Sequence, residues 1–347
     1  MHIAVTVDPE IPVPPGLYGG IERIVDLLVH GLVERGHEVT LFAHPDSEVP
    51  CRLVPYGGIG QRPLDILRNT LSVSRLALRQ PDVIHSFGRL AYLIALLPMR
   101  IPKIMSYQRH PALKRVQQAT GLAARDSLLF TGCSDHITAQ ISPHASAQTV
   151  YNGVPLDAYN FQPSVDKDAP LVFLGRIAPI KGTHHAVAVA QRSGQRLIIA
   201  GNVPDEKQAY FESKIQPHVD GDRIRFVGPV DDEEKNDLLG RAAAFLMPIE
   251  WEEPFGIVMA EAMACGTPVI GTRRGAVPEV VTEGETGFVC DTVDEMVAAV
   301  ECLRELDRVA CRQRCEAHFS DQAIVDVYEE LYEKHASGTV EQAPARS

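Results

Sequence analysis

The segment that most constrains this chain runs from Glu253 to Pro268 and reads Glu-Pro-Phe-Gly-Ile-Val-Met-Ala-Glu-Ala-Met-Ala-Cys-Gly-Thr-Pro. Proline is tolerated in the first turn of a helix but not in its interior. The pattern therefore predicts a helix from Pro254 to Cys265 that is ended by the glycine and the second proline. On that helix, Glu253 lies at the N-terminal mouth and Glu261 lies two turns inside.

This predicted helix start is a candidate ligand site. The free amides around Phe255, Gly256 and Ile257, together with the positive end of the helix dipole, can receive a phosphate or sugar hydroxyls. At 3.6 residues per turn, Glu261 lies roughly 80° around the helix from Glu253, so the two carboxylates can address different parts of one long ligand. In the alternative interpretation, Glu253 only complements the dipole and Glu261 is a solvated side chain.

The length of the chain, 347 residues, exceeds what one hydrophobic core usually supports, so two domains are expected. The first residues run straight into Asp8 and Pro9, which is unlike a signal peptide, and no apolar run reaches the length that spans a bilayer. Seven cysteines without C-x-x-C spacing argue against a disulfide framework and against a zinc site. These features predict a cytoplasmic protein.

Charge is distributed unevenly along the chain. Residues 1–160 contain 14 Lys and Arg against 13 Asp and Glu, whereas residues 161–347 contain 19 against 32, so the second half carries the negative charge. The span from Arg89 to Arg125 contains seven basic residues and no acidic one. Such a span can meet an anionic substrate or the surface of a membrane, or it can be a solvated face. We expect no nucleic-acid partner.

The first half opens with a strand, a glycine-containing loop, a helix and a second strand. The strands are predicted at His2–Val7 and Val39–Ala43, and Gly19 and Gly20 open the helix between them. In this architecture the loop after the first strand meets a ligand. Because the glycines do not form G-x-G-x-x-G, an NAD-dependent enzyme is disfavoured. The pair indicates either a phosphate or sugar contact or simply a turn.

The alternation continues to residue 133. Helices are predicted at 64–79, 90–97 and 113–124, and strands at 82–86, 103–107 and 128–133. His85 and His110 each lie near the C-terminal end of a predicted strand, where ligand sites gather in such sheets. A structural role is equally open for both histidines.

The second half repeats the pattern of the first. Residues 161–170 contain prolines and alternating charges without apolar periodicity, and we place the interdomain linker there. Strands are predicted at 171–174, 197–200, 224–227, 244–247, 269–270 and 287–289. The fold class is therefore α/β, with two Rossmann-like domains at residues 1–160 and 161–320 and parallel sheets that face each other across a cleft. Residues 337–347 are a predicted loose tail.

The turn after the predicted strand 171–174 carries two cations. Arg176 and Lys181 lie five residues apart, next to Gly175 and Gly182. Arginine suits a phosphate through a forked contact and lysine suits it as a point charge, so the pair predicts a diphosphate site. Isolated cations on a loop are usually solvated. Here the pair lies in the same half of the chain as Glu253 and Glu261, and the strand-end rule places both sets on one edge of the sheet.

Taken together, the motifs resemble those of retaining glycosyltransferases of family four, which have the GT-B fold. The segments that carry the resemblance are Gly19-Gly20, Gly175-Arg176 with Lys181-Gly182, Glu253-Pro254-Phe255-Gly256, Glu261 to Val269, Gly275 to Glu279 and Val227-Gly228-Pro229-Val230. The segment with two glutamates is specific, whereas the glycine pair alone is weak. The resemblance covers almost the whole chain.

The resemblance implies that a nucleotide-sugar donor binds mainly in the second domain. Donor-contacting residues by this resemblance are Gly19, Gly20, Gly175, Arg176, Lys181, Val230, Glu253, Phe255, Gly256, Ile257 and Glu261. By this resemblance, Arg176 and Lys181 neutralise the diphosphate of the donor, and UDP is the nucleotide most commonly expected in the family. Glu253 accepts hydrogen bonds from sugar hydroxyls, and Glu261 meets the ribose. The last helix, at 321–336, crosses back to the first domain.

The implied reaction transfers the sugar with retained anomeric configuration and without a metal or other cofactor. A leaving phosphate oxygen can assist deprotonation of the acceptor. Asp220-Gly221-Asp222 resembles the D-x-D metal motif of the other large transferase fold, but under the GT-B interpretation it is a turn. The acceptor, which can be a sugar, a lipid-linked molecule or a small molecule, is not specified.

One position departs from the family pattern. The family often has a histidine directly after a strand in a T-x-H pattern, but this chain has Ser106-Tyr107-Gln108, and His110 follows two residues later. Either Gln108 replaces that contact or the loop brings His110 to it. We expect His110 to act, as a catalytic residue alongside Arg176, Lys181 and Glu253.

Three other functions can be weighed against the same motifs. A nucleotide-sugar epimerase would convert the donor to an isomer without an acceptor, and a sugar phosphorylase is weakened because no lysine-based cofactor attachment signal is evident. A catalytically silent nucleotide-sugar-binding protein would bind the donor tightly without transfer. The charged donor-site residues make this last alternative the weaker one.

Overall fold

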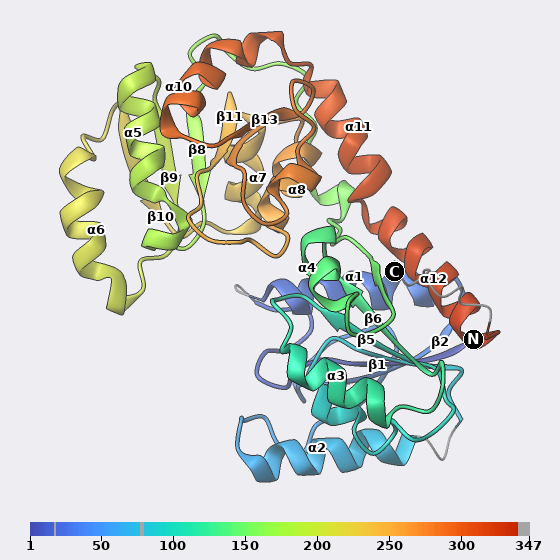
Figure 1. The fold of residues 1–347 in the computed structure, drawn as a ribbon. Helices are drawn as coiled ribbons and strands as arrows, with labels where there is room; N and C mark the ends of the chain where they lie inside the picture. The colour runs from blue at the N-terminus through green and yellow to red at the C-terminus, as the bar shows by residue number, and fades with distance from the viewer. Residues whose placement is uncertain (17–18, 77–79, 339–347) are drawn as a thin grey trace. The chain divides into compact units, whose positions relative to one another are not determined.

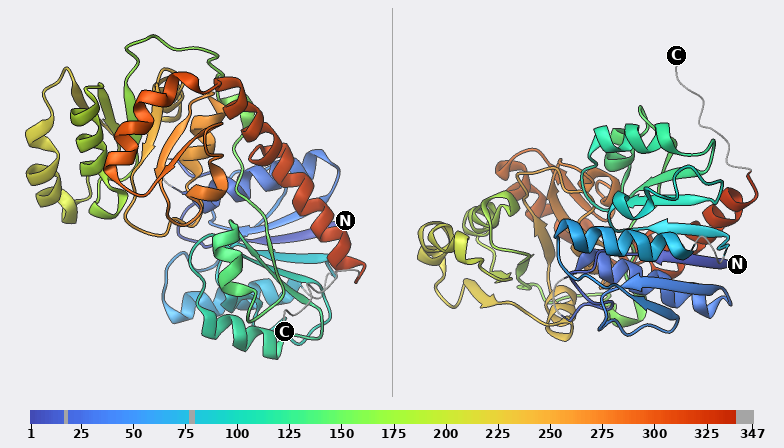
Figure 2. Two further views of the ribbon diagram at one scale, coloured as in Figure 1. Left: turned by 45° about the horizontal axis from the view of Figure 1, so that its top comes forward. Right: turned by 90° about the horizontal axis from the view of Figure 1, so that it is seen from below.

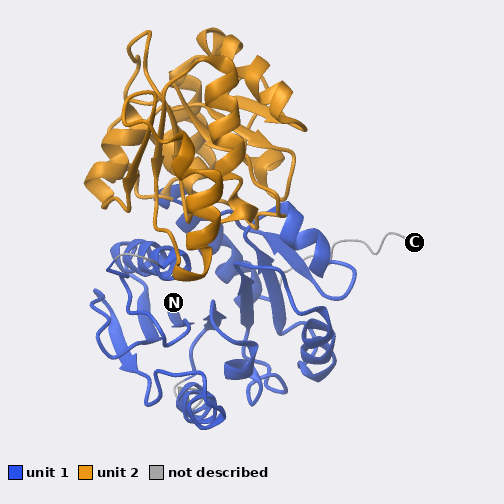
Figure 3. Cartoon of the chain, turned by 90° about the vertical axis from the view of Figure 1, so that its left-hand side faces the viewer, with its two compact units in different colours: residues 1–153, 321–347 blue, residues 154–320 orange. Residues whose placement is uncertain are grey.

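The chain folds into two compact units (Figure 3). The computed structural model describes residues 1–16, 19–76 and 80–338. Unit 1 comprises Met1–Gly153 and the segment from Asp321, and unit 2 comprises Val154–Ser320. Residues 154–160 thus group with unit 2 and not, as predicted from the sequence, with the first domain. Residues 77–79 of the predicted helix 64–79 and residues 339–347 of the predicted tail lie outside the described residues.

Unit 1 is built on a parallel sheet that helices flank (Figures 1 and 2). Within the described residues it has seven strands in the order β3-β2-β1-β4-β5-β6-β7, all paired in parallel. Its strands are β1 His2–Thr6, β2 Glu38–Ala43, β3 Arg52–Pro55, β4 Val83–Ser86, β5 Lys103–Tyr107, β6 Leu128–Gly132 and β7 Ala147–Thr149. Its helices are α1 Gly20–Glu34, α2 Pro63–Leu76, α3 Leu113–Leu122, α4 Asp135–Ile141 and α12 Asp321–Ala336, with the 3₁₀ helix η2 Leu90–Leu93.

The predicted returning helix is α12, which belongs to unit 1 and packs on α1 (Figure 1). The two helices approach closely at Gly31, where an added Cβ would lie 2.6 Å from Cγ2 of Val325. On α1, apolar side chains at helical spacing face the interior, among them Ile24 and Leu28. Glycine at this crossing lets α12 close one side of the unit.

A polar network connects α12 to the sheet inside unit 1. The imidazole of His85, in β4, is fully buried and lies 2.6 Å from the Tyr332 hydroxyl through Nδ1 and 2.6 Å from the Ser106 hydroxyl through Nε2. Burial lowers the pKa of His85 to about 3, so the ring is neutral at neutral pH. His85 therefore has a structural role, one of the two roles left open from the sequence.

Unit 2 repeats the parallel architecture on a smaller sheet. Within the described residues its six strands have the order β10-β9-β8-β11-β12-β13. They are β8 Leu171–Leu174, β9 Leu197–Ala200, β10 Ile224–Gly228, β11 Ala244–Met247, β12 Val269–Thr272 and β13 Gly287–Cys290. Its α-helices are α5 Thr183–Ser193, α6 Gln208–Lys214, α7 Asp232–Gly240, α8 Ile257–Ala264, α9 Val277–Val280, α10 Val293–Cys302 and α11 Arg308–His318. Its 3₁₀ helices are η3 Leu156–Ala158, η4 Pro179–Lys181, η5 Asp205–Lys207, η6 Gln216–His218 and η7 Leu303–Glu305.

One buried apolar core and one buried arginine hold unit 2 together. Strand residues such as Leu171 and Ile199 are inaccessible to solvent and pack with the buried face of α5, including Val189. Arg308, 8% exposed, donates four hydrogen bonds, to the carbonyls of residues 162, 240 and 242 and to the hydroxyl of Thr267. The guanidinium thereby fastens α11 to three loops of the unit.

Two predicted helices are wrong in their bounds or type. The helix predicted from Pro254 begins only at Ile257, because Gly256 takes a left-handed conformation with φ 79° and interrupts the helical path. The helix predicted at 90–97 is a 3₁₀ helix over Leu90–Leu93 followed by turns. Pro98 has no N–H to donate and disfavours helical geometry at the preceding residue, which limits the segment.

Most other predicted elements are confirmed. Four strands have the predicted bounds, and several others differ by one or two residues at an end: the four are β5, β8, β9 and β11. The short strands β3 and β7 and the helix α4 were not predicted. Among the described residues, no helix is long and apolar enough to cross a membrane.

Candidate functional site

The candidate site of unit 2 lies where the order of its strands reverses. The chain passes from β8 outward to β9 and β10, and then returns to β11 on the other side of β8. In open parallel sheets, ligands bind outside the carboxyl ends of the strands at such a switch point. The loop after β8 carries Gly175, Arg176 and Lys181, and the loop after β11 carries Glu253 and Gly256.

The two loops meet through an ion pair. Nζ of Lys181 donates to Oε2 of Glu253 at 2.6 Å, and Nε1 of Trp251 donates to the same oxygen at 3.0 Å. The Lys181 ammonium also lies 4.8 Å from the centre of the Trp251 ring. The Glu253 side chain is 11% exposed and that of Lys181 is 23% exposed, so the pair is largely desolvated while the lysine still reaches solvent. The predicted proximity of Lys181 and Glu253 is confirmed.

Glycines allow the loops of this sheet edge to approach each other. At Gly182, with φ 71°, an added Cβ would lie 1.7 Å from the carbonyl oxygen of Pro248. At Gly201, an added Cβ would lie 1.8 Å from the carbonyl oxygen of Gly175. Any other residue at either position would push the backbone apart. The loops therefore depend on glycine to hold the Lys181 and Glu253 side chains in contact.

Arg176 presents a cation to solvent at the same edge. The residue is exposed and lies directly after Gly175, whose amide donates to the carbonyl of Ala200 at 3.0 Å. No ion pair of Arg176 is recorded within the described part of the chain, whereas Lys181 is held by Glu253. The edge therefore offers one held cation and one exposed cation to an anionic ligand.

The start of α8 is less open than the sequence suggested. Phe255 is 2% exposed and packs edge-on against the ring of Phe319 at 5.7 Å, so it fixes the loop. Gly256 is the N-cap of α8, and Ile257, half-buried, is its first residue. Glu253 thus lies in the loop four residues before α8, and the angle predicted between Glu253 and Glu261 on one helix does not apply.

Glu261 is buried inside unit 2, and one of its carboxylate oxygens has two hydrogen-bond partners. Its Oε1 accepts hydrogen bonds from the Tyr159 hydroxyl and from Nζ of Lys235, each at 2.7 Å. Burial disfavours the charge of Lys235, but Glu261 and Asp232 outweigh burial and raise the pKa of Lys235. The interpretation of Glu261 as a solvated side chain is wrong. Its predicted contact with a ribose stays a prediction.

The loop after β10 leads to the helix that carries this lysine. Val230 is half-buried and directly precedes Asp231, which caps α7. The Asp231 carboxylate accepts from the amide of Glu234, and the Glu234 carboxylate accepts from the amide of Asp231. This capping box fixes the start of α7 and thereby the loop that contains Val230.

The corresponding edge of unit 1 has mixed charge. Gly19 is the N-cap of α1 and Gly20 its first residue, as predicted, with open space beside Gly20. After β1, Asp8 lies 3.5 Å from Nε of Arg89 and 3.1 Å from Nη2 of Arg109. Burial, followed by the neighbouring Glu10, raises the pKa of Asp8 above its ordinary value. Arginines at this edge are therefore paired with carboxylates.

His110 lies at the same edge of unit 1, after β5. It is exposed, and its Nδ1 lies 3.3 Å from Oε1 of Gln140, while its ring contacts that of His136. Gln108, which occupies the position where the family has a histidine, is half-buried. Whether His110 or Gln108 contacts a donor stays a prediction.

Family profiles match nearly the whole chain. The profile of Glycosyltransferase Family 4 matches residues 18–158, and the profile of Glycosyl transferases group 1 matches residues 158–316. The chain belongs to glycosyltransferase family four. The two parallel α/β units of this family-four glycosyltransferase are those of the GT-B fold.

Known relatives agree with this assignment. The chain is 28% identical to a glycogen synthase of Mycobacterium tuberculosis over 87% of this chain and 86% of the relative. It is 26% identical to a glycosyltransferase involved in avilamycin A biosynthesis, with a TM-score of 0.74 over 97% of this chain and 98% of that structure. It shares the fold of HepE from Anabaena in complex with UDP-glucose, at 20% identity and a TM-score of 0.74 over 96% and 100% of the two chains.

One cluster of this family-four glycosyltransferase has the side chains of a metal site. Among the described residues, His184, His185 and Glu250 bring three potential ligand atoms within 4.8 Å of one another. Their hydrogen bonds account for the arrangement, because Oε1 of Glu250 lies 2.8 Å from Nε2 of His185 and the Tyr210 hydroxyl lies 2.8 Å from Nδ1 of His184.

All seven cysteines are free thiols.

The D-x-D sequence is a turn, as predicted. Gly221 has φ 80°, and Oδ1 of Asp220 accepts hydrogen bonds from the amides of Asp222 and Ile224. The first carboxylate is therefore directed at its own backbone. This segment adds nothing to the donor edge.

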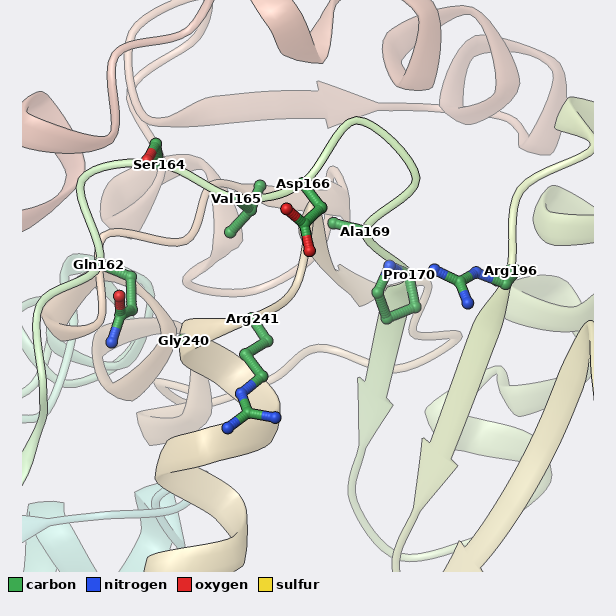
Figure 4. A pocket seen from close by; sticks show the side chains of 9 residues that line it. All are labelled: Gln162, Ser164, Val165, Asp166, Ala169, Pro170, Arg196, Gly240 and Arg241. Atoms are coloured by element: carbon green, nitrogen blue, oxygen red, sulfur yellow. The ribbon is translucent and has the colours of Figure 1, made fainter.

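A hollow of about 440 Å³ in unit 2 lies at the opposite edge of the sheet (Figure 4). Pro170 and Arg196, which line it, directly precede β8 and β9, so the hollow is at the amino ends of these strands. The predicted linker segment forms its other side, including Asp166 (Figure 4). Because ligands of open parallel sheets bind at the carboxyl ends, this hollow is not the candidate donor site.

The basic span of the glycosyltransferase, Arg89 to Arg125, does not form a single positive face. Lys103 is inaccessible, donates to the carbonyls of residues 99 and 101, and has a pKa lowered to about 8 by burial. Arg89 and Arg109 pair with acidic residues before the span. The acidic partners of these two arginines lie outside the basic span, so a count of charges within the span could not reveal them.

Three residues of the unit 2 site were not predicted from the sequence. Trp251 contacts both members of the ion pair, and Tyr159 and Lys235 hold Glu261. Trp251 carried a signal, since it is the single tryptophan of the chain and lies two residues from Glu253. Tyr159 lies 102 residues before Glu261, so its contact depends on the fold alone.

Proposed function

We propose that this chain transfers a sugar from a nucleoside-diphosphate sugar to an acceptor hydroxyl, with retention of configuration at the anomeric carbon. The observation that carries the proposal is the desolvated Lys181–Glu253 pair beside the exposed Arg176 at the switch point of unit 2. A cation held by a carboxylate keeps further N–H groups for a phosphate, and the neighbouring carboxylate can accept hydrogen bonds from hydroxyls. This combination suits a ligand that joins a diphosphate to a sugar.

In the proposed reaction, the bond between the anomeric carbon and the diphosphate oxygen breaks, and its electron pair stays on the diphosphate. Arg176 and Lys181 stabilise this developing negative charge. The acceptor oxygen forms the new bond on the face from which the diphosphate leaves, and the acceptor proton passes to a leaving phosphate oxygen. Glu253 holds the donor sugar by its hydroxyls during the transfer, and no metal or cofactor takes part.

The remaining predicted residues fit supporting roles. Glu261, held by Lys235 and Tyr159, is proposed to meet the ribose, and Val230 the region of the base. Gly19 and Gly20 are proposed to border the donor phosphates at the start of α1, where Gly20 leaves open space, and His110 is proposed to approach the sugar from unit 1. UDP-sugars are the first donors to test, because HepE is a UDP-glucose complex with the same fold. A cytoplasmic location remains part of this proposal.

The test is release of nucleotide diphosphate from a panel of nucleotide sugars with sugar, lipid-linked and small-molecule acceptors. Lys181→Ala and Glu253→Gln are compared with matched surface controls of unit 2, Lys167→Ala and Glu206→Gln, whose side chains are exposed. We expect loss of transfer in the first pair and wild-type transfer in the controls. Full turnover in both site variants would remove the assigned roles.

The product decides between the reaction classes. Coupling constants of the anomeric proton, measured by nuclear magnetic resonance, report whether configuration is retained. Inversion would contradict the mechanism while leaving the donor site intact. Conversion of the donor into an isomer without an acceptor would indicate an epimerase, and tight donor binding without turnover would indicate a silent binding protein.

A further inference from the structure

Helix α2 of unit 1, Pro63–Leu76, exposes an apolar stripe. Leu64, Leu67 and Leu71 are 68%, 54% and 50% exposed, whereas most large apolar residues of the chain are buried. Their spacing of three and four residues places them on one face of the helix. Figure 1 shows α2 along the margin of unit 1, and the view from below in Figure 2 shows it at the front of that unit.

Arginines lie along the same face of α2. At 100° per residue, Arg68 and Arg75 lie between about 20° and 100° from the three leucine positions, so these five residues occupy a stripe about 100° wide. Both arginines are exposed, and no ion pair of either is recorded within the described residues. Arg62, also exposed, directly precedes the helix. We call the three leucines together with Arg68 and Arg75 the α2 stripe.

The opposite face of α2 is used by unit 1 itself. Asn69 is inaccessible and exchanges hydrogen bonds with the backbone of Gly58, and Val73 is inaccessible. Thr70 donates through its hydroxyl to the carbonyl of Ile66, within the helix. The acidic residue of the helix, Asp65, is only partly exposed and would meet a Cβ added at Gly58. The outward face therefore carries leucine and arginine without an exposed carboxylate.

We propose that the α2 stripe binds the surface of an anionic lipid bilayer, with the leucines in the interface and the arginines at lipid phosphates. Leucine on one side of a stripe and arginine beside it is the pattern of helices that lie in the plane of a membrane. The arginine stems can lie along apolar surface while their guanidinium groups reach the headgroups. The complementary charge is local, since the whole chain has a formal net charge of −12 and is repelled by anionic lipid elsewhere.

A second copy of the chain fits the stripe less well. Pairing two α2 stripes about a two-fold axis would bring the arginines of both copies into one small interface, where like charges repel. Obligate dimers also bury broad apolar surfaces, whereas three leucines on one helix form a narrow strip. The bilayer supplies both phosphate and apolar surface along the full helix.

The test is sedimentation of the full chain with vesicles of phosphatidylcholine alone or with about a third phosphatidylglycerol. We expect binding to the anionic vesicles at low salt, weaker binding as salt rises, and little binding to phosphatidylcholine alone. Leu67→Ser with Leu71→Ser, and separately Arg68→Glu with Arg75→Glu, should each weaken the partition coefficient at least about tenfold. These side chains are exposed, so circular dichroism and melting temperature should remain those of the wild type.

Matched controls separate this surface from the basic span. Lys114→Glu with Arg115→Glu changes two exposed cations of α3, and Leu122→Ser changes an exposed leucine that is 56% accessible. Both controls should keep vesicle binding within about twofold. Loss of binding in the α3 variants but not in the α2 variants would overturn the assignment, as would absence of binding by the wild type.

These measurements also distinguish membrane binding from dimerisation of the chain and from the transferase activity. A dimer in sedimentation velocity that the leucine variants convert to monomer, without vesicle binding, would overturn the proposal in favour of a second copy. Vesicle binding requires neither a donor nor turnover. The membrane inference therefore stands or fails separately from the proposed sugar transfer.

Discussion

The two sheet edges of this glycosyltransferase share a topology but differ in charge. In both units the strand order reverses beside the first strand, and a glycine-containing loop follows that strand. In unit 2 the loop carries the exposed Arg176 and the partly exposed Lys181, whereas in unit 1 Arg89 and Arg109 are paired with Asp8 or Glu10. The same fold therefore prepares one edge for an anion and leaves the other with mixed polarity.

A Rossmann-like topology therefore supplies a place for a ligand but does not determine the chemistry of the site. In unit 2, Glu253 is the carboxylate that holds Lys181, and a phosphate would complete the coordination of the lysine. In unit 1, Asp8 has a raised pKa because burial disfavours its charge, and its arginine partners are already engaged. This difference supports the proposal that the diphosphate binds at unit 2 and the acceptor at unit 1.

The largest predicted effect separates the two edges directly. Lys181→Ala should lower kcat/KM for the nucleotide sugar by about 100- to 1,000-fold, because a preorganised charge that stabilises the leaving group is lost. Arg109→Ala, at the edge of unit 1, should leave donor affinity within about threefold. Steady-state kinetics with calorimetric donor binding checks both. An equal loss of donor affinity in the two variants would contradict the proposed difference between the two edges.

A smaller effect concerns the shape of the unit 2 cation. Arg176→Lys keeps the charge but loses the forked pair of donors, and we expect about a tenfold loss of kcat/KM. Arg176→Ala should lower kcat/KM more than Arg176→Lys does. If the two variants are equally impaired or both unimpaired, Arg176 does not bind phosphate through a forked contact.

The cores of the units should also differ in their response to acid. The folded chain keeps His85 neutral down to about pH 3, whereas an unfolded histidine takes up a proton below about pH 6.5. The unfolded state thus binds more protons in this window, so the stability of unit 1 should fall as pH falls, by about 2 kcal/mol at pH 5. His85→Gln should remove this pH dependence.

Two probes can follow the units separately during acid unfolding. Trp251, the single tryptophan, lies in unit 2, while circular dichroism reports both units. We expect the dichroism to change at a higher pH than the tryptophan fluorescence. Coincident transitions, or an unchanged slope in the His85 variant, would contradict the assignment of acid sensitivity to the unit 1 core.

The smallest predicted effect is that of metal removal. Because Glu250 is a hydrogen-bond partner of His185 and Tyr210 is one of His184, chelation with EDTA should change the transfer rate less than about twofold. The matched variant is His185→Gln, which retains a hydrogen-bonding side chain. Loss of activity on chelation, restored by a divalent cation and insensitive to this variant, would place a required metal elsewhere.

Much of the parallel framework could be predicted because strand signals are local. Apolar runs of four or five residues between turns predicted β8 and β11 with the observed bounds, and the strand-end rule then predicted that Lys181 and Glu253 share an edge. The start of α8 could not be predicted from Pro254, because the left-handed Gly256 redirects the chain. A favourable helical pattern does not show where a loop must turn.

The partners of charged residues depended on the tertiary structure. Glu261 gave no sign in the sequence of its contacts with Tyr159 and Lys235, and the acid-free span gave no sign that Lys103 is buried. Conversely, the exposure of the leucines on α2 follows from which face packs on unit 1, not from the residues themselves. Charge counts along a sequence therefore locate groups without showing which of them remain available.

The most direct test of the donor assignment is the fluorescence of Trp251, titrated with UDP-glucose and other nucleotide sugars. Its Nε1 donates to Glu253 and its ring faces Lys181, so a donor at this edge changes the surroundings of the single tryptophan. We predict a saturable change in fluorescence with one nucleotide sugar. The affinity obtained from the titration should be at least about tenfold weaker in Lys181→Ala and unchanged in Lys167→Ala. Donor binding measured by calorimetry without any change in Trp251 fluorescence, or with equal affinity in Lys181→Ala, would contradict the assignment.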